Sequence, residues 1–342
     1  MRKRAVSLFC ALSLLALTAC GPKTLEQSTT IFAMDTVMNL TVYYPGENGA
    51  QAFFQEKVED IYEFEALFSS TREGSDIHNL NAGGGEKTAV SLDTADVLSQ
   101  ALALCEKTGG ALDITARPAV TAWGFTTGEY RVVPEDERKE LAERIDYTAV
   151  ELDGETVAIP EGMELDLGAV AKGYVGDRLA EKLRNGGVTS ALLDLGQSTI
   201  AAVGTKPDGR PWRIGIQDPH GESYLGVLEL NDRSMGSSGN YQRYFEENGV
   251  KYGHILDPET AAPADNGLAG VTVVADSALY CDGLSTALFV MVLEDAAEFW
   301  EENRDFEAIF IEENGNITIT AGLQGSFRLQ VDQQHREVTV LE

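Results

Sequence analysis

The stretch LDLGAVAKGY, residues 165–174, combines an acid, two glycines and a lysine where a strand pattern gives way to a helix pattern. Its first residues alternate apolar and acidic side chains, which is typical of a strand with one apolar face. Gly168 allows the chain to turn tightly where the expected strand ends. A helix that begins near Ala169 would direct unpaired N–H groups and the positive end of its dipole at the junction. Such a junction is a natural site for a phosphate or pyrophosphate.

Two charged residues of this junction have alternative interpretations. Lys172 would lie in the first turn of the helix, where the helix dipole disfavours a cation unless an anion sits above it. Asp166 and Lys172 would then belong to an anion site. Alternatively, Asp166 caps the helix and Lys172 is a solvated surface lysine, and the residues alone leave both interpretations open.

Outward from the junction, helix and strand patterns interleave, and several strands are hairpin neighbours. Apolar residues at helical spacing predict helices over 53–69, 94–108, 134–145 and 169–187. Short runs with period-two alternation predict strands over 31–44, 190–196, 212–219, 224–231, 234–238, 327–331 and 336–342, and a hairpin over 307–322. This order predicts an α+β fold with mixed, largely antiparallel sheets rather than a doubly wound parallel sheet.

The N-terminus predicts export and a lipid anchor. MRKR is followed by an apolar run of signal-peptide length, too short to span a membrane comfortably. The run ends in LTAC, so residues 1–19 are expected to be removed before a lipidated Cys20. Residues 20–30 would form a tether and 31–342 the folded domain. The alternative is an ordinary secretory signal with an incidental cysteine.

The chain is strongly acidic, with a formal net charge of −29. This charge argues against nucleic acid and anionic lipid headgroups as partners. An acidic enzyme that binds an anionic substrate needs a metal ion or a few specific donors at its site. Cys105 and Cys281 are the cysteines that remain in the predicted mature body. They are expected to be either one disulfide or, more often for this pattern, two buried thiols.

Asp282 and Thr286 are four residues apart in YCDGLSTALFV, on one face of an expected helix. A carboxylate and a hydroxyl in this arrangement suit a hard cation, with water and phosphate oxygens as further ligands. Asp282 as a helix N-cap is the alternative.

His254, in GHILDPETAAP, differs from the other three histidines, which lie in polar surroundings. It precedes apolar residues and a turn-forming Asp-Pro pair, so it is either a structural histidine or a general base. Four aromatic residues could line a planar ligand or belong to the core: Trp123, Phe125, Tyr241 and Tyr244.

The order of the motifs resembles that of the ApbE family, the FAD:protein FMN transferases. The matching stretches run over about residues 31–292 and include FAMDTVMNL, ALDITARPAVTAWGF, LDLGAVAKGYVGD, HILDPETAAP and VTVVADSALYCDGLSTAL. The resemblance implies the family's T-fold-like architecture of intertwined subdomains. It also implies Mg²⁺-dependent transfer of the FMN half of FAD to a threonine or serine hydroxyl of an acceptor protein, with release of AMP.

The resemblance also assigns roles to residues. The metal ligands would be the Ala169 carbonyl, Asp282 and Thr286, and the catalytic base would be His254. The FAD contacts would be Met34, Thr71, Trp123, Gly124, Phe125, Asp166, Lys172, His254 and Ile255. The acceptors of such enzymes include flavoprotein subunits of Na⁺-pumping quinone reductases and Rnf-type complexes, around a D-G-x-[ST]-G-A-[ST] threonine. A lipid-anchored position on the extracytoplasmic side of a bacterial membrane is expected.

Two rival functions remain open. A Mg²⁺-dependent FAD pyrophosphatase would use water in place of threonine, and a flavin-binding lipoprotein would perform no chemistry. The sequence departs from the family's usual motifs at three places, which concern how the flavin and the adenine are bound: Asp35 after Met34, Leu195-Gly196-Gln197, and ETAAP at 259–263. None of them touches the expected metal ligands.

Overall fold

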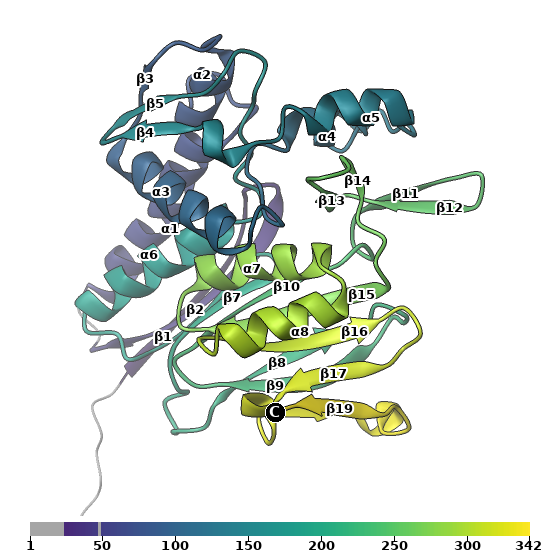
Figure 1. The fold of residues 1–342 in the computed structure, drawn as a ribbon. Coiled ribbons are helices and arrows are strands. Elements are labelled where there is room, and N and C mark those ends of the chain that lie inside the picture. Colours follow the sequence, from purple (N-terminus) through teal and green to yellow (C-terminus); the bar gives the residue numbers. More distant parts are fainter. Residues whose placement is uncertain (1–23, 47–48) are drawn as a thin grey trace, which may run out of the picture.

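A nine-stranded sheet runs through the centre of the protein (Figure 1). The computed structural model describes residues 24–46 and 49–342. Neighbouring strands are antiparallel except β17 and β19. In spatial order, the strands are β1 (Thr24–Ala33), β2 (Thr36–Pro45), β6 (Ser190–Asp194), β7 (Thr199–Gly204), β10 (Ser234–Ser238), β15 (Leu268–Ala275), β16 (Glu307–Glu312), β17 (Ile317–Thr320) and β19 (Val338–Leu341).

Helices cover one face of this sheet, and the main hydrophobic core lies between the two layers. The core includes fully buried side chains such as Leu40 of β2, Ile61 of α1 and Leu98 of α3. Burial of such aliphatic and aromatic side chains supplies most of the stabilisation of a layered fold. The helices of this layer are α1 (Ala50–Phe68), α3 (Leu92–Lys107), α6 (Ala171–Asn185), α7 (Ala278–Val290) and α8 (Leu293–Glu302).

A three-stranded sheet covers the opposite face. It consists of β8 (Trp212–Gln217), β9 (Tyr224–Leu230) and β18 (Phe327–Leu329). A second core between the two sheets contains Ile200 and Met235 of the large sheet and Ile216 and Leu228 of the small one. The protein is therefore helical on one side of its central sheet and a sheet sandwich on the other.

Smaller elements surround the helical layer, and a third core joins two of the helices to two hairpins. The helices and strands outside the main layers are α2 (Asp76–Ala82), α4 (Arg117–Ala122), α5 (Glu135–Ala142), β3 (Thr88–Ala89), β4 (Glu151–Asp153), β5 (Thr156–Ala158), β11 (Tyr244–Glu247), β12 (Val250–Gly253), β13 (Leu256–Asp257) and β14 (Ala262–Pro263). Short 3₁₀ turns cover Tyr147–Ala149, Ala321–Leu323 and Val331–Gln333. The third core holds Trp123 and Phe125 against the β11–β12 hairpin.

The predicted α+β class with mixed, largely antiparallel sheets is confirmed. The single strand expected over 31–44 is wrong, because these residues belong to the β1–β2 hairpin. Met34 and Asp35 form its two-residue turn with φ of 50° and 58°, the left-handed geometry that such hairpin turns require. Strand β1 also takes in residues 24–30, which were expected in the tether. The pairing partner that orders this polar segment is β2. Residues 1–23, with the expected signal segment and Cys20, lie outside the described residues.

Three further predictions concern local structure. Residues 165–168 form no strand beyond an isolated bridge at Glu164, and α6 begins at Ala171. The helix expected from 94 begins earlier, because Ser91 caps α3 through the N–H of Thr94. Cys105 and Cys281 are two buried free thiols. Across the described residues, no helix combines the length and apolar character that a membrane span needs.

Candidate active site

The carboxylate of Asp282 lies against the first turn of α6. One of its oxygens accepts hydrogen bonds from the backbone N–H of Gly173, at 3.1 Å, and from the Lys172 ammonium, at 3.5 Å. The other accepts from the Thr199 hydroxyl at 2.8 Å. The anion at the start of the helix is thus a carboxylate of the protein itself, contributed by α7.

Burial raises the pKa of Asp282, while the nearby Lys172 charge and the hydrogen bonds from Thr199 and Gly173 act to lower it. The Lys172 ammonium also donates to the carbonyl of Gly168 at 3.3 Å. It therefore joins the 168–169 segment to the carboxylate. This position agrees with the interpretation of Lys172 as a site residue, because its side chain is only 18 % exposed.

Thr286 lies one helical turn beyond Asp282 and is half-buried. Its hydroxyl is 3.1 Å from that of Ser238, the last residue of β10, and 3.4 Å from the carbonyl of Asp282. Ser238 also contacts the Ser285 hydroxyl at 2.9 Å. The end of β10 thus presents a small cluster of hydroxyl groups beside the backbone carbonyl of Asp282.

The donors expected to hold Mg²⁺ are all oxygens: a carboxylate, a hydroxyl and a backbone carbonyl. Within residues 24–46 and 49–342, no three side chains of His, Cys, Asp or Glu come together in a way that suits a metal ion. A hard cation at Asp282 and Thr286 would therefore complete its shell with water and substrate oxygens, the usual arrangement for Mg²⁺ on a phosphate ligand. The Lys172 ammonium contacts the same carboxylate at 3.5 Å, so a bound cation would share Asp282 with Lys172. The donor set fits the ion.

Asp166 belongs to a separate polar group that includes Arg117 of α4. The Arg117 guanidinium donates to the Ser70 hydroxyl at 2.7 Å and to Glu164 at 2.8 Å, and lies 3.4 Å from Asp166. Asp166 also accepts from the N–H of Gly168 at 2.7 Å and from Ser70 at 3.4 Å. Asp166 is therefore joined both to the Gly168 segment and to the loop after α1.

Two predicted flavin contacts lie near this loop. Thr71 is exposed and its hydroxyl is 3.3 Å from that of Ser69, while its neighbour Ser70 makes the contact to Asp166. Met34 is at the hairpin turn, where its N–H donates to Glu65 of α1 at 2.7 Å. The turn is thus fastened to the helix from which the loop departs.

His254 lies between β12 and β13. Its Nδ1 is 3.1 Å from the carbonyl of Arg243, which also accepts from the backbone N–H of His254 at 3.1 Å. A carbonyl only accepts hydrogen bonds, so Nδ1 carries the proton and Nε2 keeps its lone pair. Burial and then the Arg243 charge lower the pKa of His254 to about 4, so the imidazole is neutral at pH 7. This is the protonation state that a general base needs.

The predicted aromatic wall is divided in the structure. Trp123 and Phe125 are buried to 2 % and 1 % exposure, and the Trp123 indole N–H donates to the carbonyl of Ala261 at 2.8 Å. Phe125 meets His254 with ring centroids 6.3 Å apart, and its carbonyl accepts from the Arg243 guanidinium. Tyr244 instead faces outward under Lys251. The 123–125 segment is thus a support for His254.

The Lys172 cation also acts to lower the pKa of His254.

Residues that the sequence interpretation missed are Ser70, Arg117, Thr199, Ser238 and Arg243. Of these, Arg117 lies in one of the quoted motifs, and none of the five has a spacing that indicates its partner. Their roles depend on contacts between segments distant in the chain.

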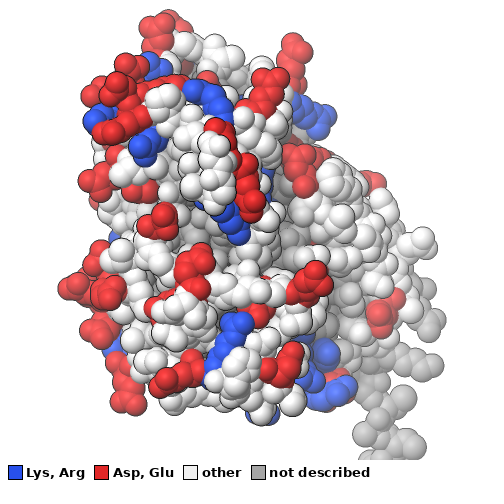
Figure 2. Space-filling view, turned by 90° about the vertical axis from the view of Figure 1, so that its right-hand side faces the viewer, with Lys and Arg blue, Asp and Glu red and all other residues white. Residues whose placement is uncertain are grey.

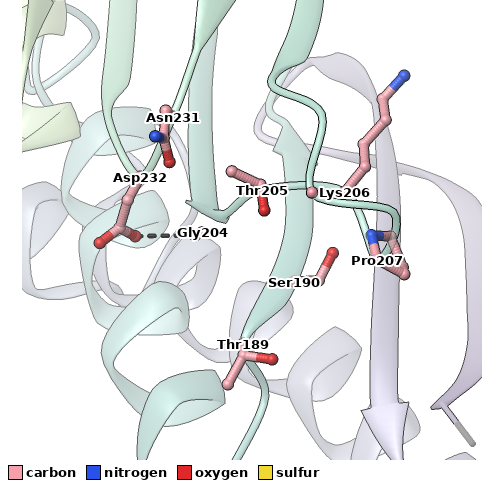
Figure 3. Close-up of a pocket in the computed structure, with 9 residues that line it drawn as sticks. Thr189, Ser190, Gly204, Thr205, Lys206, Pro207, Asn231 and Asp232 are labelled. Carbon is pink, nitrogen blue, oxygen red and sulfur yellow. Dashed lines mark hydrogen bonds between the residues drawn. The ribbon is translucent and has the colours of Figure 1, made fainter. Parts of the chain in front are cut away.

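Two hollows open on the described surface. One, of about 440 Å³, is lined by hydroxyl residues including Thr189 and Ser190, and the Lys206 ammonium extends away from them (Figure 3). It contains none of the predicted site residues. The other, of about 790 Å³, includes Asp35, next to Met34, and Ser238, next to the hydroxyl cluster. Of these two hollows, the larger adjoins the predicted site.

The surface agrees with an acidic protein. In the face drawn in Figure 2, acidic side chains form scattered groups with basic ones among them, and no extended basic field is present there. This pattern gives no support to a nucleic-acid site on that face.

Comparison with known proteins places these features in a family. The model of the ApbE family matches residues 34–310. The FAD:protein FMN transferase of Haemophilus influenzae is 33 % identical over 334 residues, which cover 93 % of this chain and 96 % of that protein. The corresponding protein of Vibrio cholerae is 34 % identical over 302 residues, which cover 85 % and 89 %.

Solved structures of ApbE proteins also resemble this chain. The crystal structure of the ApbE protein of Thermotoga maritima superposes with a TM-score of 0.83 at 30 % identity, covering 89 % of this chain and all of that one. The apo flavinyl transferase ApbE of Pseudomonas stutzeri gives a TM-score of 0.80 at 28 % identity, covering 90 % and 98 %. The family model spans the turn of the β1–β2 hairpin, the α6 junction and α7. The chain belongs to the ApbE family.

Proposed function

We propose that this protein is an FAD:protein FMN transferase that moves the FMN half of FAD onto a threonine or serine hydroxyl of an acceptor protein and releases AMP. The observation that carries the proposal is the match of the chain to this family over residues 34–310, and a neutral His254 and a buried Asp282 carboxylate in contact with Lys172 support it. A base for a hydroxyl and a cationic group for a phosphate are the two requirements of such a transfer.

The protein's residues would act in the following way. Nε2 of His254 takes the proton of the acceptor hydroxyl as its oxygen forms a bond to the FMN-side phosphorus. The P–O bond to the AMP half breaks, and AMP leaves with the electron pair. Lys172 places a positive charge next to the pyrophosphate, whose negative charge grows on the departing oxygen. The Arg243 carbonyl keeps Nδ1 protonated, and so fixes the tautomer in which Nε2 accepts.

Asp282, Thr286 and the Ala169 carbonyl would hold Mg²⁺. When bound, the ion supplies neutralisation of pyrophosphate charge, which an acidic chain cannot provide from its own surface. Thr199 and Gly173 position the Asp282 carboxylate through hydrogen bonds of 2.8 and 3.1 Å. Asp166, Met34 and the loop that contains Thr71 would contact FAD. Arg117 joins this loop to Asp166 through its contacts with Ser70 and Asp166.

We further propose a lipid-anchored position on the extracytoplasmic side of a bacterial membrane. The support is the sequence alone: a basic start, a short apolar run and LTAC before Cys20. Replacing Cys20 with serine tests this, because the variant should lose incorporation of labelled palmitate and leave the membrane fraction. Acceptors of the Na⁺-pumping quinone reductase or Rnf type fit such a location.

The decisive experiment for the activity combines the protein with FAD, Mg²⁺ and an acceptor domain that carries a D-G-x-T-G-A-T sequence. Mass spectrometry should show an FMN increment on the acceptor threonine, with one AMP released for each flavin attached. Free FMN and AMP without acceptor labelling would indicate a pyrophosphatase, and unchanged FAD would indicate a binding protein. Omission of Mg²⁺ and replacement of the acceptor threonine by alanine are the matched controls.

A further inference from the structure

The larger hollow has an exposed apolar rim. Phe32, Val37 and Tyr224 are 64 %, 48 % and 55 % exposed, and all three line it. They are three of the eleven large hydrophobic side chains that are exposed in the described ranges, so more than a quarter of them gather at one hollow. Exposed apolar side chains that cluster in this way usually mark a binding surface. We call this hollow and its rim the sheet groove.

The rim is built from paired strands. Phe32 of β1 and Val37 of β2 are direct cross-strand partners in the hairpin, so their side chains stand on the same side. Opposite them, the Tyr224 ring lies over Gly215 of β8, where an added Cβ would come within 2.6 Å of the ring. Gly215 therefore allows the ring to lie close against the strand.

The floor of the sheet groove is the sandwich side of the central sheet. Leu192, Ile200, Met235 and Ile311 line it, and all belong to or pack against the core between the two sheets. The groove is thus a local opening in a sheet sandwich. Polar side chains also line it, among them Asp194, Arg213 and Gln217, so it offers apolar contacts together with hydrogen-bond partners, as protein interfaces do.

The sheet groove approaches the proposed transfer site at the end of β10. Ser238 lines the groove and contacts Thr286. Asp35 lines it directly after Met34. Ile200 also lines the groove, whereas the preceding Thr199 points to the other face of the sheet, where it holds Asp282. A chain seated in the groove would therefore reach Ser238, whose hydroxyl contacts that of the proposed metal ligand Thr286.

We propose that the sheet groove binds the acceptor polypeptide through apolar side chains close to the hydroxyl residue that receives FMN. This inference rests on the proposed function, since it supplies that transfer with a place for its protein substrate. The volume of about 790 Å³ accommodates a few side chains of a segment rather than a whole domain face. Phe32 and Tyr224 would contribute most of the binding free energy, as aromatic residues do at protein interfaces.

The test uses the double variant Phe32→Ser/Tyr224→Ser in the full folded chain. Its matched control is Leu92→Ser/Tyr62→Ser, which removes a large apolar and a tyrosine side chain at exposed positions (71 % and 42 %) away from the groove. The probe is the acceptor domain with the D-G-x-T-G-A-T sequence. The groove variant should raise the KM for this domain about tenfold or more, while the control and the affinity for FAD stay at wild-type values.

Failure of this inference can be separated from failure of the proposed function. If the wild type labels the acceptor and the groove variant keeps the same acceptor KM, the groove is overturned and the transferase stands. If the variant weakens FAD binding instead, the groove binds the nucleotide and the inference is overturned. If the variant changes the sedimentation of the protein alone, the groove binds a second copy of the chain, which also overturns the inference. If the wild type labels nothing, direct binding of the domain is measured, and equal affinity for wild type and variant overturns the groove.

Discussion

The Asp282 carboxylate of α7 accepts a hydrogen bond from the backbone N–H of Gly173 in the first turn of α6, at 3.1 Å. In the proposed nucleotide site, this contact gives a role to a helix start that has no phosphate-binding loop of its own. The positive end of α6 holds a carboxylate, and that carboxylate is a proposed ligand of Mg²⁺. The helix would therefore act on the substrate indirectly, by positioning the carboxylate.

Asp282→Asn tests this arrangement. The amide has nearly the same shape, but it offers one acceptor and one donor, and its N–H₂ group would face the donors of Gly173, Lys172 or Thr199. We expect the rate of flavin transfer to fall about a hundredfold or more, and its dependence on Mg²⁺ concentration to be lost.

The control for that variant is Asp276→Asn, whose side chain is 96 % exposed. It should transfer flavin at the wild-type rate. An Asp282→Asn protein with wild-type rate and an unchanged Mg²⁺ titration would remove Asp282 from the proposed site.

His254→Ala should spare FAD binding and reduce turnover, because the imidazole is held by the Arg243 carbonyl and is proposed to act on the acceptor hydroxyl. A loss of about 10²- to 10⁴-fold in kcat is expected for removal of a general base. FAD affinity is measured by quenching of flavin fluorescence and turnover by mass spectrometry of the acceptor. Unchanged turnover would exclude His254 from the mechanism.

The pH dependence follows from the lowered pKa of His254, about 4. A base with this pKa is already unprotonated well below neutrality, so it loses its function only as pH falls toward that value. The rate should therefore show no histidine titration between about pH 5.5 and 8, where an unperturbed imidazole titrates. A half-maximal rate near the ordinary histidine value would show that burial does not control this group.

Local rules single out the candidate site residues, although the residues alone leave a structural interpretation open for each of them. Asp282 and Thr286 share a face through helical spacing alone, and the α6 junction is recognisable from its glycine and its helix pattern. His254 stands out because it lies between a strand and a turn. The all-antiparallel centre of the sheet followed from the hairpin signals.

The remainder depends on contacts between distant segments. Thr199 reaches Asp282 across 83 residues of sequence, and Ser70 reaches Asp166 across 96. No periodicity records such pairs. The polar start of β1, residues 24–30, has the composition of a linker and becomes a strand only because β2 supplies its hydrogen-bond partners.

Asp177→Ala is expected to destabilise the fold. Its carboxylate accepts from the Ser277 hydroxyl at 2.6 Å and from the N–H groups of Ala278 and Leu279 at 2.6 and 3.0 Å, so it caps α7 from α6. Loss of a buried cap of this kind costs about 1–3 kcal/mol of the free energy of unfolding. Urea denaturation followed by circular dichroism measures it, with the exposed Asp153→Ala as control. Equal midpoints for the two variants would contradict the capping role.

Arg117→Lys tests a residue that joins three segments of the FAD side of the site. The guanidinium contacts Ser70 and Glu164 at 2.7 and 2.8 Å and Asp166 at 3.4 Å. The ammonium of a lysine cannot reproduce the planar geometry with which the guanidinium contacts these three partners. The loop after α1 should lose its fixed position, so we expect the KM for FAD to rise about tenfold while kcat changes less. Arg210→Lys, at a side chain 76 % exposed, should leave both constants unchanged. A lower kcat at constant KM would instead place Arg117 in the transfer step itself, because it would then stabilise the transition state and not the bound substrate.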